Sequence, residues 1–301
     1  MIHFMPTATV VADSINQQGN RLTTFQLRYW RGIHSELMTH RKFSRCAGSS
    51  RARPSQAIID QVRSTPWGPP SWGANQPGMQ ADAELSPEKT LIAKATWVHA
   101  ANNAAAQALL LLREGAHKQI VNRLLEPFTF IDVIVSSTEY NNWWALREDA
   151  AADPAIRLLT KEMHKAYDAS TTTLLLPGTW HLPFVKIDFE LQEAVDFVES
   201  QDGVIHAPGK SPLDVLFMVS AARCARTSYR TFDGTVAPIK DDVILFRKLV
   251  SANLVHASPL EHQATPDIQN KELKWASPHL HGNFTGWIQF RKMVPNEYVP
   301  G

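Results

Sequence analysis

Two β-prone runs near the start of the chain, separated by a short polar loop, place the strongest constraint on the fold. Residues 7–12 and 21–29 are rich in Thr, Val, Leu and aromatic side chains, and the loop 16–20 contains Gly19 and two asparagines. Short β-prone runs joined by such turn residues predict a β-hairpin. The chain is therefore expected to contain an antiparallel sheet.

Helical patterns occupy much of the chain after the hairpin. The predicted helices lie at 32–43, 88–125 (interrupted at Gly115), 154–167, 211–225 and 241–254. A β-branched stretch covers 127–142, and 171–189 is expected to be loop and strand. Residues 63–87 are rich in Pro, Gly and Trp and lack periodicity, which predicts a long structured loop that serves as a lid or wall. The mixture predicts an α+β protein that forms one interwoven body over 1–301.

Composition narrows the class of protein. The 301 residues are 44% hydrophobic and carry a formal net charge of +1, which disfavours a broad nucleic-acid-binding surface. Cys46 and Cys224 are the only cysteines, too few for a disulfide framework. The start lacks a basic segment followed by an apolar one, and the longest mainly apolar run, 104–112, is too short to cross a bilayer. We therefore expect a cytoplasmic protein with no membrane and no nucleic-acid partner.

The segment with the most distinctive chemistry is Thr39-His-Arg-Lys-Phe-Ser-Arg-Cys-Ala-Gly-Ser-Ser-Arg-Ala-Arg53. Arginine side chains, serine hydroxyls and backbone N–H groups near Gly48 suit a phosphate or diphosphate. A solvated basic turn explains the same composition. However, four of the five basic side chains after His40 are arginine and only one is lysine, which favours a binding site.

Three further segments give weaker signals. Basic residues within 117–127 are explained equally well by the C-terminus of a helix. In Tyr140-Asn-Asn-Trp-Trp-Ala-Leu-Arg147, an amide, a guanidinium and two indoles suit a flat heterocycle, although a packed aromatic pair accounts for them too. His256-Ala-Ser-Pro-Leu-Glu-His262 fits no common zinc spacing. For this last segment we predict a hydrogen-bonding role and no metal site.

Taken together, these segments resemble the flavin-dependent thymidylate synthases. His40-Arg41-x-x-Ser44-x-x-x-x-Ser49-x-Arg51 is similar to the family signature, in a form typical of phage-type members. Residues 122–127, 142–147 and 256–262 resemble the family's nucleotide- and flavin-contacting segments. The order is unusual, because 256–262 and 221–229 resemble segments that precede the signature in the common form. Residues 171–301 are thus expected to replace the family's usual N-terminal segment, after the signature-bearing residues 1–170, by permutation or by internal duplication.

The resemblance implies a flavin-dependent C5 methyltransferase that converts dUMP to dTMP, with methylenetetrahydrofolate and NADPH as co-substrates. It further implies an antiparallel sheet with long helices, and a homotetramer with FAD sites at subunit interfaces, in the host cytoplasm if the protein is phage-encoded. The implied FAD contacts are His40, Arg41, Ser44, Asn142, His256 and Ser258. The implied nucleotide contacts are Glu36, Ser49, Arg51, Arg123 and Arg147. Among these, Ser49 and Arg147 are expected to be catalytic, with Arg147 stabilising negative charge on the pyrimidine.

Two departures from the family pattern leave the base and the product open. Cys46 stands where the signature has Asn, and Asp153 stands where a later motif has Gln. Neither replacement reproduces the donors and acceptors of an amide, so C5 methylation or hydroxymethylation of dCMP or dUMP is an alternative activity. Neutral drift at a packed position also explains Cys46. A degenerate member that binds flavin or nucleotide without catalysis is a further hypothesis, which retention of the signature residues disfavours.

Overall fold

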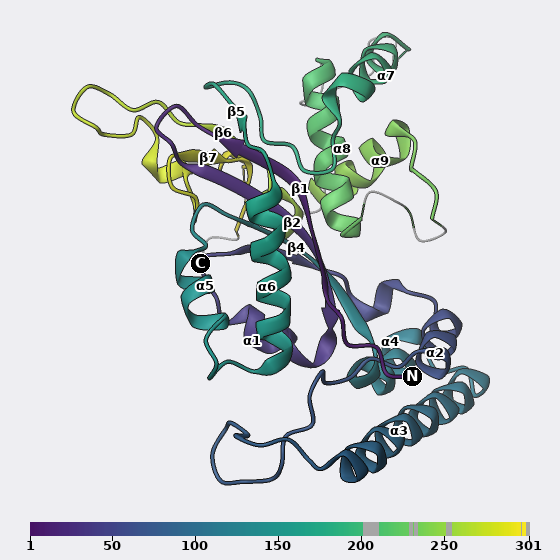
Figure 1. The fold of residues 1–301 in the computed structure, drawn as a ribbon. Coiled ribbons are helices and arrows are strands. Elements are labelled where there is room, and N and C mark those ends of the chain that lie inside the picture. Colours follow the sequence, from purple (N-terminus) through teal and green to yellow (C-terminus); the bar gives the residue numbers. More distant parts are fainter. Residues whose placement is uncertain (201–210, 229–230, 232–233, 251–254, 296, 299–301) are drawn as a thin grey trace.

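The computed structural model describes residues 1–200, 211–228, 231, 234–250, 255–295 and 297–298. A five-stranded sheet of order β3-β4-β2-β1-β5 forms its centre (Figure 1). The strands are β1 (Thr7–Ile15), β2 (Arg21–Trp30), β3 (Ser44–Ala47), β4 (Phe130–Ser137) and β5 (Thr173–Leu174). All neighbouring pairs are antiparallel except β1 and β5, which are parallel. The structure confirms the predicted α+β class with an antiparallel-dominated sheet and long helices.

The predicted hairpin is confirmed, and its turn has a clear local cause. The side-chain oxygen of Asn16 accepts hydrogen bonds from the backbone N–H groups of Gln18 and Asn20, at 3.1 and 2.9 Å. Gly19 adopts a φ of 83°, which residues with a Cβ adopt only at a steric cost. These contacts reverse the chain within five residues and set the register of β1 against β2.

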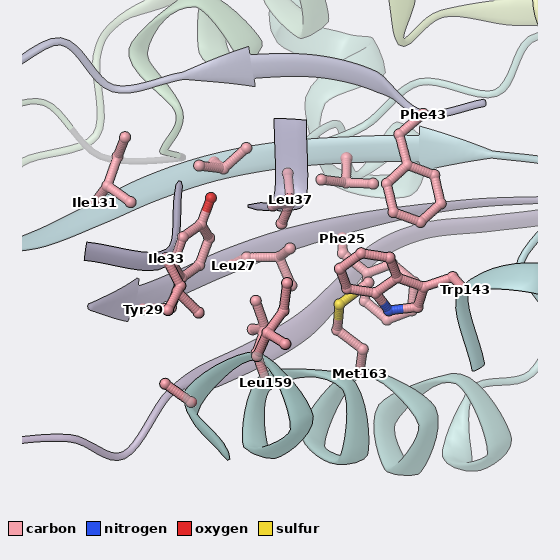
Figure 2. Packing of buried hydrophobic residues seen from close by; sticks show 14 of the residues in the cluster. Phe25, Leu27, Tyr29, Ile33, Leu37, Phe43, Ile131, Trp143, Leu159 and Met163 are labelled. Atoms are coloured by element: carbon pink, nitrogen blue, oxygen red, sulfur yellow. The ribbon is translucent and has the colours of Figure 1, made fainter. Parts of the chain in front are cut away.

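Side chains alternate between the two faces of the central strands. Phe25, Leu27 and Tyr29 of β2 are buried in the main core together with Val133 and Val135 of β4. Helices α1 (His34–Met38), α5 (Asn141–Arg147) and α6 (Pro154–Ala169) contribute further residues of this core, including Leu37, Trp143, Leu159 and Met163 (Figure 2). A period of two is expected for a strand with one face against helices. The opposite face of β2 and β4 is therefore left for polar groups.

A second group of helices lies beside the opposite side of the sheet (Figure 1). It contains α7 (Ile187–Ser200), α8 (Pro212–Arg226) and α9 (Ile239–Val250), which share a separate apolar core. Ser211 and Asp214 form a capping box that starts α8. Arg223 is buried within the group and pairs with Glu190 at 2.6 Å and with Asp242 at 3.1 Å. These ion pairs connect all three helices.

A third group of helices packs around a further apolar core. It contains α2 (Ser55–Ser64), α3 (Pro87–Arg113), α4 (Lys118–Val121) and the 3₁₀ helix η3 (Asn122–Phe128). The predicted interruption of helix 88–125 at Gly115 is confirmed, because Gly115 adopts a φ of 82° just after α3 ends, and the part after it forms α4 and η3. Residues 65–86 form the predicted long loop, held by isolated bridges such as Gly73–Glu84. Among the described residues, no helix combines the length and hydrophobicity needed to cross a membrane.

Several other predicted boundaries need correction. The predicted helix 32–43 is reduced to η1 (Arg31–Ile33) and α1, because the chain turns after Met38 and enters β3 at Ser44. The predicted β stretch 127–142 is a strand only in β4, since η3 precedes it and α5 follows. The predictions for 154–167 and 211–225 are confirmed by α6 and α8. Residues 251–254, at the end of the predicted helix 241–254, lie outside the described residues.

The sequence did not predict the remaining elements. They are α2, α7, β3, η2 (Ser50–Ala52), η4 (Ser258–Glu261), β6 (Ala264–Pro266), η5 (Pro278–Leu280), β7 (Trp287–Gln289) and η6 (Phe290–Met293). Most of them are too short for a periodic pattern. β6 and β7 pair antiparallel as a separate two-stranded sheet.

A chain of buried hydroxyls and imidazoles crosses the polar face of the sheet. Ser14 contacts Nδ1 of His181 at 2.9 Å, and Nε2 of His181 contacts Thr24 at 2.8 Å. Thr24 contacts Ser136 at 2.6 Å, and Ser136 contacts Nδ1 of His262 at 2.8 Å. Burial lowers the pKa of both histidines from 6.5 to about 3. Both imidazoles are therefore neutral in the folded protein.

We predict that acid destabilises the protein through these two histidines. Below pH 6.5 the unfolded chain binds a proton at each imidazole while the folded chain does not, so stability falls as pH falls from 6.5 toward 3. Each histidine contributes a slope of about 1.4 kcal/mol per pH unit in this window. His181→Gln should remove one such contribution, measured by urea unfolding at pH 6 and 5. The exposed His99→Gln is the control; an unchanged slope in His181→Gln would contradict the assignment.

Candidate functional site

The loop that follows β3, residues 48–53, is called the signature loop here because it carries the end of the signature. Its own polar groups hold it between β4 and η3. The backbone N–H of Gly48 donates to the carbonyl of Asp132 at 2.7 Å. The hydroxyl of Ser49 accepts from the backbone N–H of Arg51 and starts η2. The side-chain amide of Asn122 donates to the carbonyls of Ser50 and Arg53, at 2.8 and 3.1 Å. These hydrogen bonds fix the loop in place. None of them uses the guanidinium group of Arg51 or of Arg53.

Gly48 also lies close to the end of the second helical group. A Cβ built at Gly48 would lie 3.2 Å from the carbonyl oxygen of Asp132 and 3.4 Å from the hydroxyl of Thr227. Thr227 follows α8 in a left-handed conformation, with a φ of 55°. A larger residue at position 48 would push β4 and the end of α8 apart.

A cavity of about 610 Å³ lies where the signature loop, the ends of β2 and β4, and the ends of α8 and α9 meet. Its polar lining is rich in arginine and hydroxyl groups. The polar lining residues are Arg28, Arg31, Ser49, Ser50, Arg53, Asn122, Thr129, Asp132, Arg226, Thr227, Ser228 and Thr231. Four guanidinium groups against a single carboxylate in this lining make the cavity suited to an anionic ligand.

Most of these arginines have carboxylate partners. Arg28 makes a two-point contact with Asp132 at 2.7 and 3.0 Å. Arg31 pairs with Glu126 at 3.1 Å, and Arg226 pairs with Asp242 at 2.5 Å. Arg53 pairs with no carboxylate of the described chain.

His40 and Arg147 form a second cluster, at the ends of α1 and α5. The imidazole of His40 contacts the rings of Phe43 and Trp143, with centroid distances of 4.3 and 5.4 Å. Burial lowers the pKa of His40, and the positive charges of Arg147 and Arg45 lower it further. Arg147 donates to the hydroxyl of Thr39 at 3.2 Å. The cluster therefore presents a neutral imidazole beside a permanent cation.

Two buried nitrogen atoms in this cluster have no hydrogen-bond partner within the described residues. They are Nε2 of His40 and Nε of Arg147. Glu36 is half-buried nearby in α1, while Arg41 and Asn142 are exposed. Buried polar atoms are normally satisfied, so atoms left without a partner are candidates for ligand contacts.

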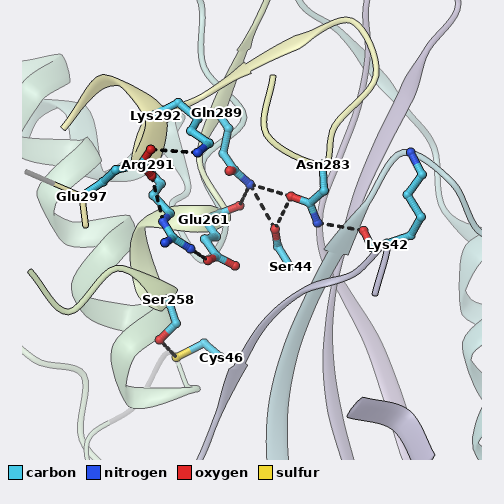
Figure 3. A network of polar contacts seen from close by, with 10 residues as sticks. All are labelled: Lys42, Ser44, Cys46, Ser258, Glu261, Asn283, Gln289, Arg291, Lys292 and Glu297. Carbon is cyan, nitrogen blue, oxygen red and sulfur yellow. Dashed lines mark hydrogen bonds and ion pairs between the residues drawn. The ribbon is translucent and has the colours of Figure 1, made fainter. Parts of the chain in front are cut away.

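Ser44 and Ser258 lie in a third region, where the C-terminal residues cover β3 (Figure 3). The buried hydroxyl of Ser44 donates to Asn283 at 3.0 Å and accepts from the side chain of Gln289 at 3.0 Å. The hydroxyl of Ser258 lies 3.9 Å from the sulfur of Cys46. His256, two residues before Ser258, is exposed. The segment 256–262 thus lies against the signature strand, although about two hundred residues separate them in the chain.

Arg51 and Arg123 line a different surface from Ser49. They face an open concavity of about 550 Å³ together with Gln119 and the apolar side chains of Leu111, Ile120 and Leu124. Both arginines are exposed. Within one chain, the predicted nucleotide contacts are therefore distributed over separate surfaces.

The structure gives structural roles to the two residues that depart from the family pattern. Cys46 is buried in β3, and burial raises the pKa of its thiol to about 11. Asp153 caps α6 by accepting from the backbone N–H groups of Ala155 and Ile156, at 2.8 and 3.2 Å. Cys46 is a neutral, packed thiol, and the carboxylate of Asp153 is engaged by a helix N-terminus.

Sequence reasoning missed the arginines that line the cavity. Arg28, Arg53 and Arg226 were not among the predicted contacts. Arg53 lies in the distinctive basic run, and Arg226 lies in the segment 221–229, whose Tyr229 is outside the described residues. Their place in one cavity depends on the packing of α8 against the sheet, which no local pattern reveals. In the described portion of the chain, no three His, Cys, Asp or Glu residues are grouped to hold a metal ion.

Comparison with known proteins gives structural similarity only. No family model matches the chain, and no curated protein matches it. A UMP/dUMP methylase, PolB from Streptomyces cacaoi bound with 5-Br UMP, has 17% identity and a TM-score of 0.46, covering 55% of this chain and 90% of that one. Thymidylate Synthase X (ThyX) from Helicobacter pylori with FAD and dUMP has 17% identity and a TM-score of 0.34, covering 48% and 67%. At these values the similarity alone assigns no function to this chain.

We predict that Asp153 acts as a helix cap. Asp153→Ala should lower the free energy of unfolding by about 1 kcal/mol, because the first N–H groups of α6 lose their acceptor. Asp153→Asn should retain most of the stability, since asparagine is an equally good cap. Urea denaturation measures both. A change in nucleotide preference in Asp153→Asn, with stability unchanged, would contradict a purely structural role.

Proposed function

We propose that the protein is a flavin-dependent enzyme that methylates C5 of a pyrimidine deoxynucleotide, converting dUMP to dTMP. The observation that carries the proposal is the cavity of about 610 Å³ beside the signature loop. Small-molecule sites typically enclose about 300–1,000 Å³, so the cavity accommodates a nucleotide. Its arginines and Ser49 suit a phosphate monoester, and Phe130 adds an aromatic surface.

The signature residues fit a flavin site in part. The partnerless nitrogens of His40 and Arg147 and the exposed Arg41 and Asn142 are available to a ligand. We propose that His40, Arg41 and Asn142 hold FAD, with His256 and Ser258 completing the site. We include Ser44 in this proposed site; in the described chain its buried hydroxyl is hydrogen-bonded to Asn283 and Gln289.

When bound, FAD reduced by NADPH supplies the reducing equivalents for the one-carbon transfer from methylenetetrahydrofolate. The protein's own groups position the reactants and stabilise charge. We propose that Arg147 contacts a carbonyl oxygen of the pyrimidine, where it stabilises the negative charge that develops as C5 becomes nucleophilic. A guanidinium keeps its charge throughout the reaction, and the neutral His40 beside it does not compete for the same negative charge.

The separation of the predicted contacts supports a site that needs more than one subunit. Arg51 and Arg123 are exposed on one surface, while Asn142 and His256 are exposed on others. Ser49 lines the cavity while Arg51 and Arg123 face the separate concavity, so within one chain the predicted nucleotide contacts lie on two surfaces. We propose that a homotetramer unites them, with Ser49, Arg51, Arg123 and Glu36 contributing to nucleotide binding.

We propose that residues 171–301 supply what the usual N-terminal segment supplies in the flavin-dependent thymidylate synthases. Two contacts support this. Ser258 lies beside Cys46 of the signature strand. Arg226 and Thr227 line the same cavity as Ser49. Both contacts join the C-terminal residues to the signature-bearing residues 1–170.

We predict that the purified protein contains flavin and forms a methylated nucleotide. Incubation with NADPH, methylenetetrahydrofolate and either dUMP or dCMP, followed by mass analysis, identifies the base and the product together. A product from dUMP that is heavier by one methylene group is expected. A hydroxymethylated product, or one made from dCMP, would show that the protein has the alternative activity and not dTMP formation. Colourless protein that ignores added FAD and makes no product would refute the proposal.

We predict that Arg147→Ala abolishes turnover while FAD remains largely bound. The variant loses a charge expected to act in the transition state, and loss of such a group commonly costs about 10²–10³-fold in kcat. The measurements are turnover with saturating substrates and the flavin absorbance of the purified variant. Arg157→Ala on α6 is the matched control, because within the described residues its guanidinium donates to the carbonyl of Ala150 and lies outside the proposed site. Normal turnover in Arg147→Ala would refute the assigned role.

A further inference from the structure

Arg53 differs from the other arginines of the cavity in its pairing. Arg28 has Asp132 and Arg31 has Glu126. Within the described residues, no carboxylate lies within ion-pair distance of Arg53, although its side chain lines the cavity. Burial lowers the pKa of Arg53, and the nearby charge of Asp132 only partly opposes that effect. The fold thus leaves the charge of Arg53 incompletely compensated.

The local charges confirm this imbalance. Arg223 and Arg226 share Asp242, and Arg223 also pairs with Glu190. These two arginines are therefore matched by two carboxylates. Arg28 and Arg31 each have a carboxylate partner as well. Among the described residues, the positive charge of Arg53 beside the cavity therefore has no carboxylate partner.

An aromatic ring holds Arg53 in place of an ion pair. The guanidinium carbon of Arg53 lies 4.5 Å from the centroid of the Phe130 ring, and that of Arg28 lies 4.1 Å from it. A cation over an aromatic face is attracted to it without using its N–H groups as donors. The contact therefore orients the guanidinium of Arg53 and leaves its donors free for a ligand.

Two further polar groups in the lining have unmet hydrogen-bonding capacity. Oδ1 of Asn122 is buried without a partner in the described chain, and the residue is 1% exposed. Nε of Arg226 is likewise buried and without a partner there. Asn122 offers an acceptor and Arg226 a donor. A ligand with both an anionic group and polar hydrogens would satisfy them.

We propose that Arg53, assisted by Arg226, binds the phosphate of the nucleotide substrate in this cavity. The inference deepens the proposed function and rests on it for the identity of the nucleotide. A phosphate monoester supplies the missing negative charge, and its oxygens accept the free N–H groups of both arginines. Arg51 faces the separate concavity, so a single chain offers Arg53 and not Arg51 to a ligand in this cavity.

The test compares the affinity for dUMP with that for deoxyuridine, which lacks the phosphate, by calorimetry on the whole protein. Wild type should bind dUMP more tightly. Arg53→Gln should weaken dUMP binding by about ten- to a hundredfold and change deoxyuridine binding by less than about twofold, because only the phosphate contact is lost. Arg53→Lys, which keeps the charge but not the planar fork, should give an intermediate loss. Arg63→Gln, an exposed arginine of α2, is the matched control and should bind both ligands as wild type does.

The outcomes test the inference about Arg53 and the proposed function separately. Equal dUMP affinity in wild type and Arg53→Gln overturns the inference, as does a wild type that binds dUMP no better than deoxyuridine. If Arg53→Gln does not fold, Arg53→Lys replaces it in the same comparison, and an unchanged dUMP affinity there overturns the inference. Arg53-dependent binding of dUMP by a protein that forms no methylated product supports the inference and overturns the proposed function. Product formation with an unchanged KM for dUMP in Arg53→Gln supports the proposed function and overturns the inference.

Discussion

The antiparallel pairing of β2 with β4 is the interaction on which the positions of the candidate site residues depend. The two strands pair over eight residues, from Thr23 opposite Ser137 to Trp30 opposite Phe130. β2 leads into the segment that carries His40, and β4 leads into α5 with Arg147. β4 also pairs with the signature strand β3. A register shift of one residue would turn the apolar residues of either strand to the polar face and separate these groups.

The two faces of this pairing have different roles. The face toward α6 is apolar and supplies the main core. The opposite face carries the buried hydroxyl–histidine chain, and farther along it Gln26 donates to the carbonyl of Thr227. α8 lies against this second face through that hydrogen bond and through a small apolar cluster of Cys46, Ile134, Phe184 and Cys224. The arginine-lined cavity forms where these helices end.

The sequence predicted those elements whose determinants are local. The hairpin follows from β-prone runs and turn residues, and α6 and α8 follow from periodicity with proline at the first turn. β3 was missed because its four residues pair with a strand almost ninety positions later. α7 was missed because its apolar pattern is completed by α8 and α9. The predicted helix 32–43 failed at its end, where the chain turns after Met38 and enters β3 at Ser44.

For the candidate site too, local features were predicted and features that depend on long-range packing were not. The signature identified the loop that borders the cavity, because its residue types and spacing are specific. It did not identify Arg28 or Arg226, since their contribution depends on long-range packing and on which carboxylates already compensate them. The structural roles of Cys46 and Asp153 were likewise invisible, because capping and burial depend on where a helix begins and how a strand is covered.

The hydrogen bonds of Ser44 carry a consequence for how the protein is made. Residue 44 leaves the ribosome long before Asn283 and Gln289, to which its hydroxyl is hydrogen-bonded. The surroundings of the signature strand are therefore assembled only after Gln289, 245 residues later in the chain, has emerged. A chain that stops before Asn283 leaves a strand with an uncovered polar face and an edge open to other molecules. Premature termination thus yields a product disposed to aggregate.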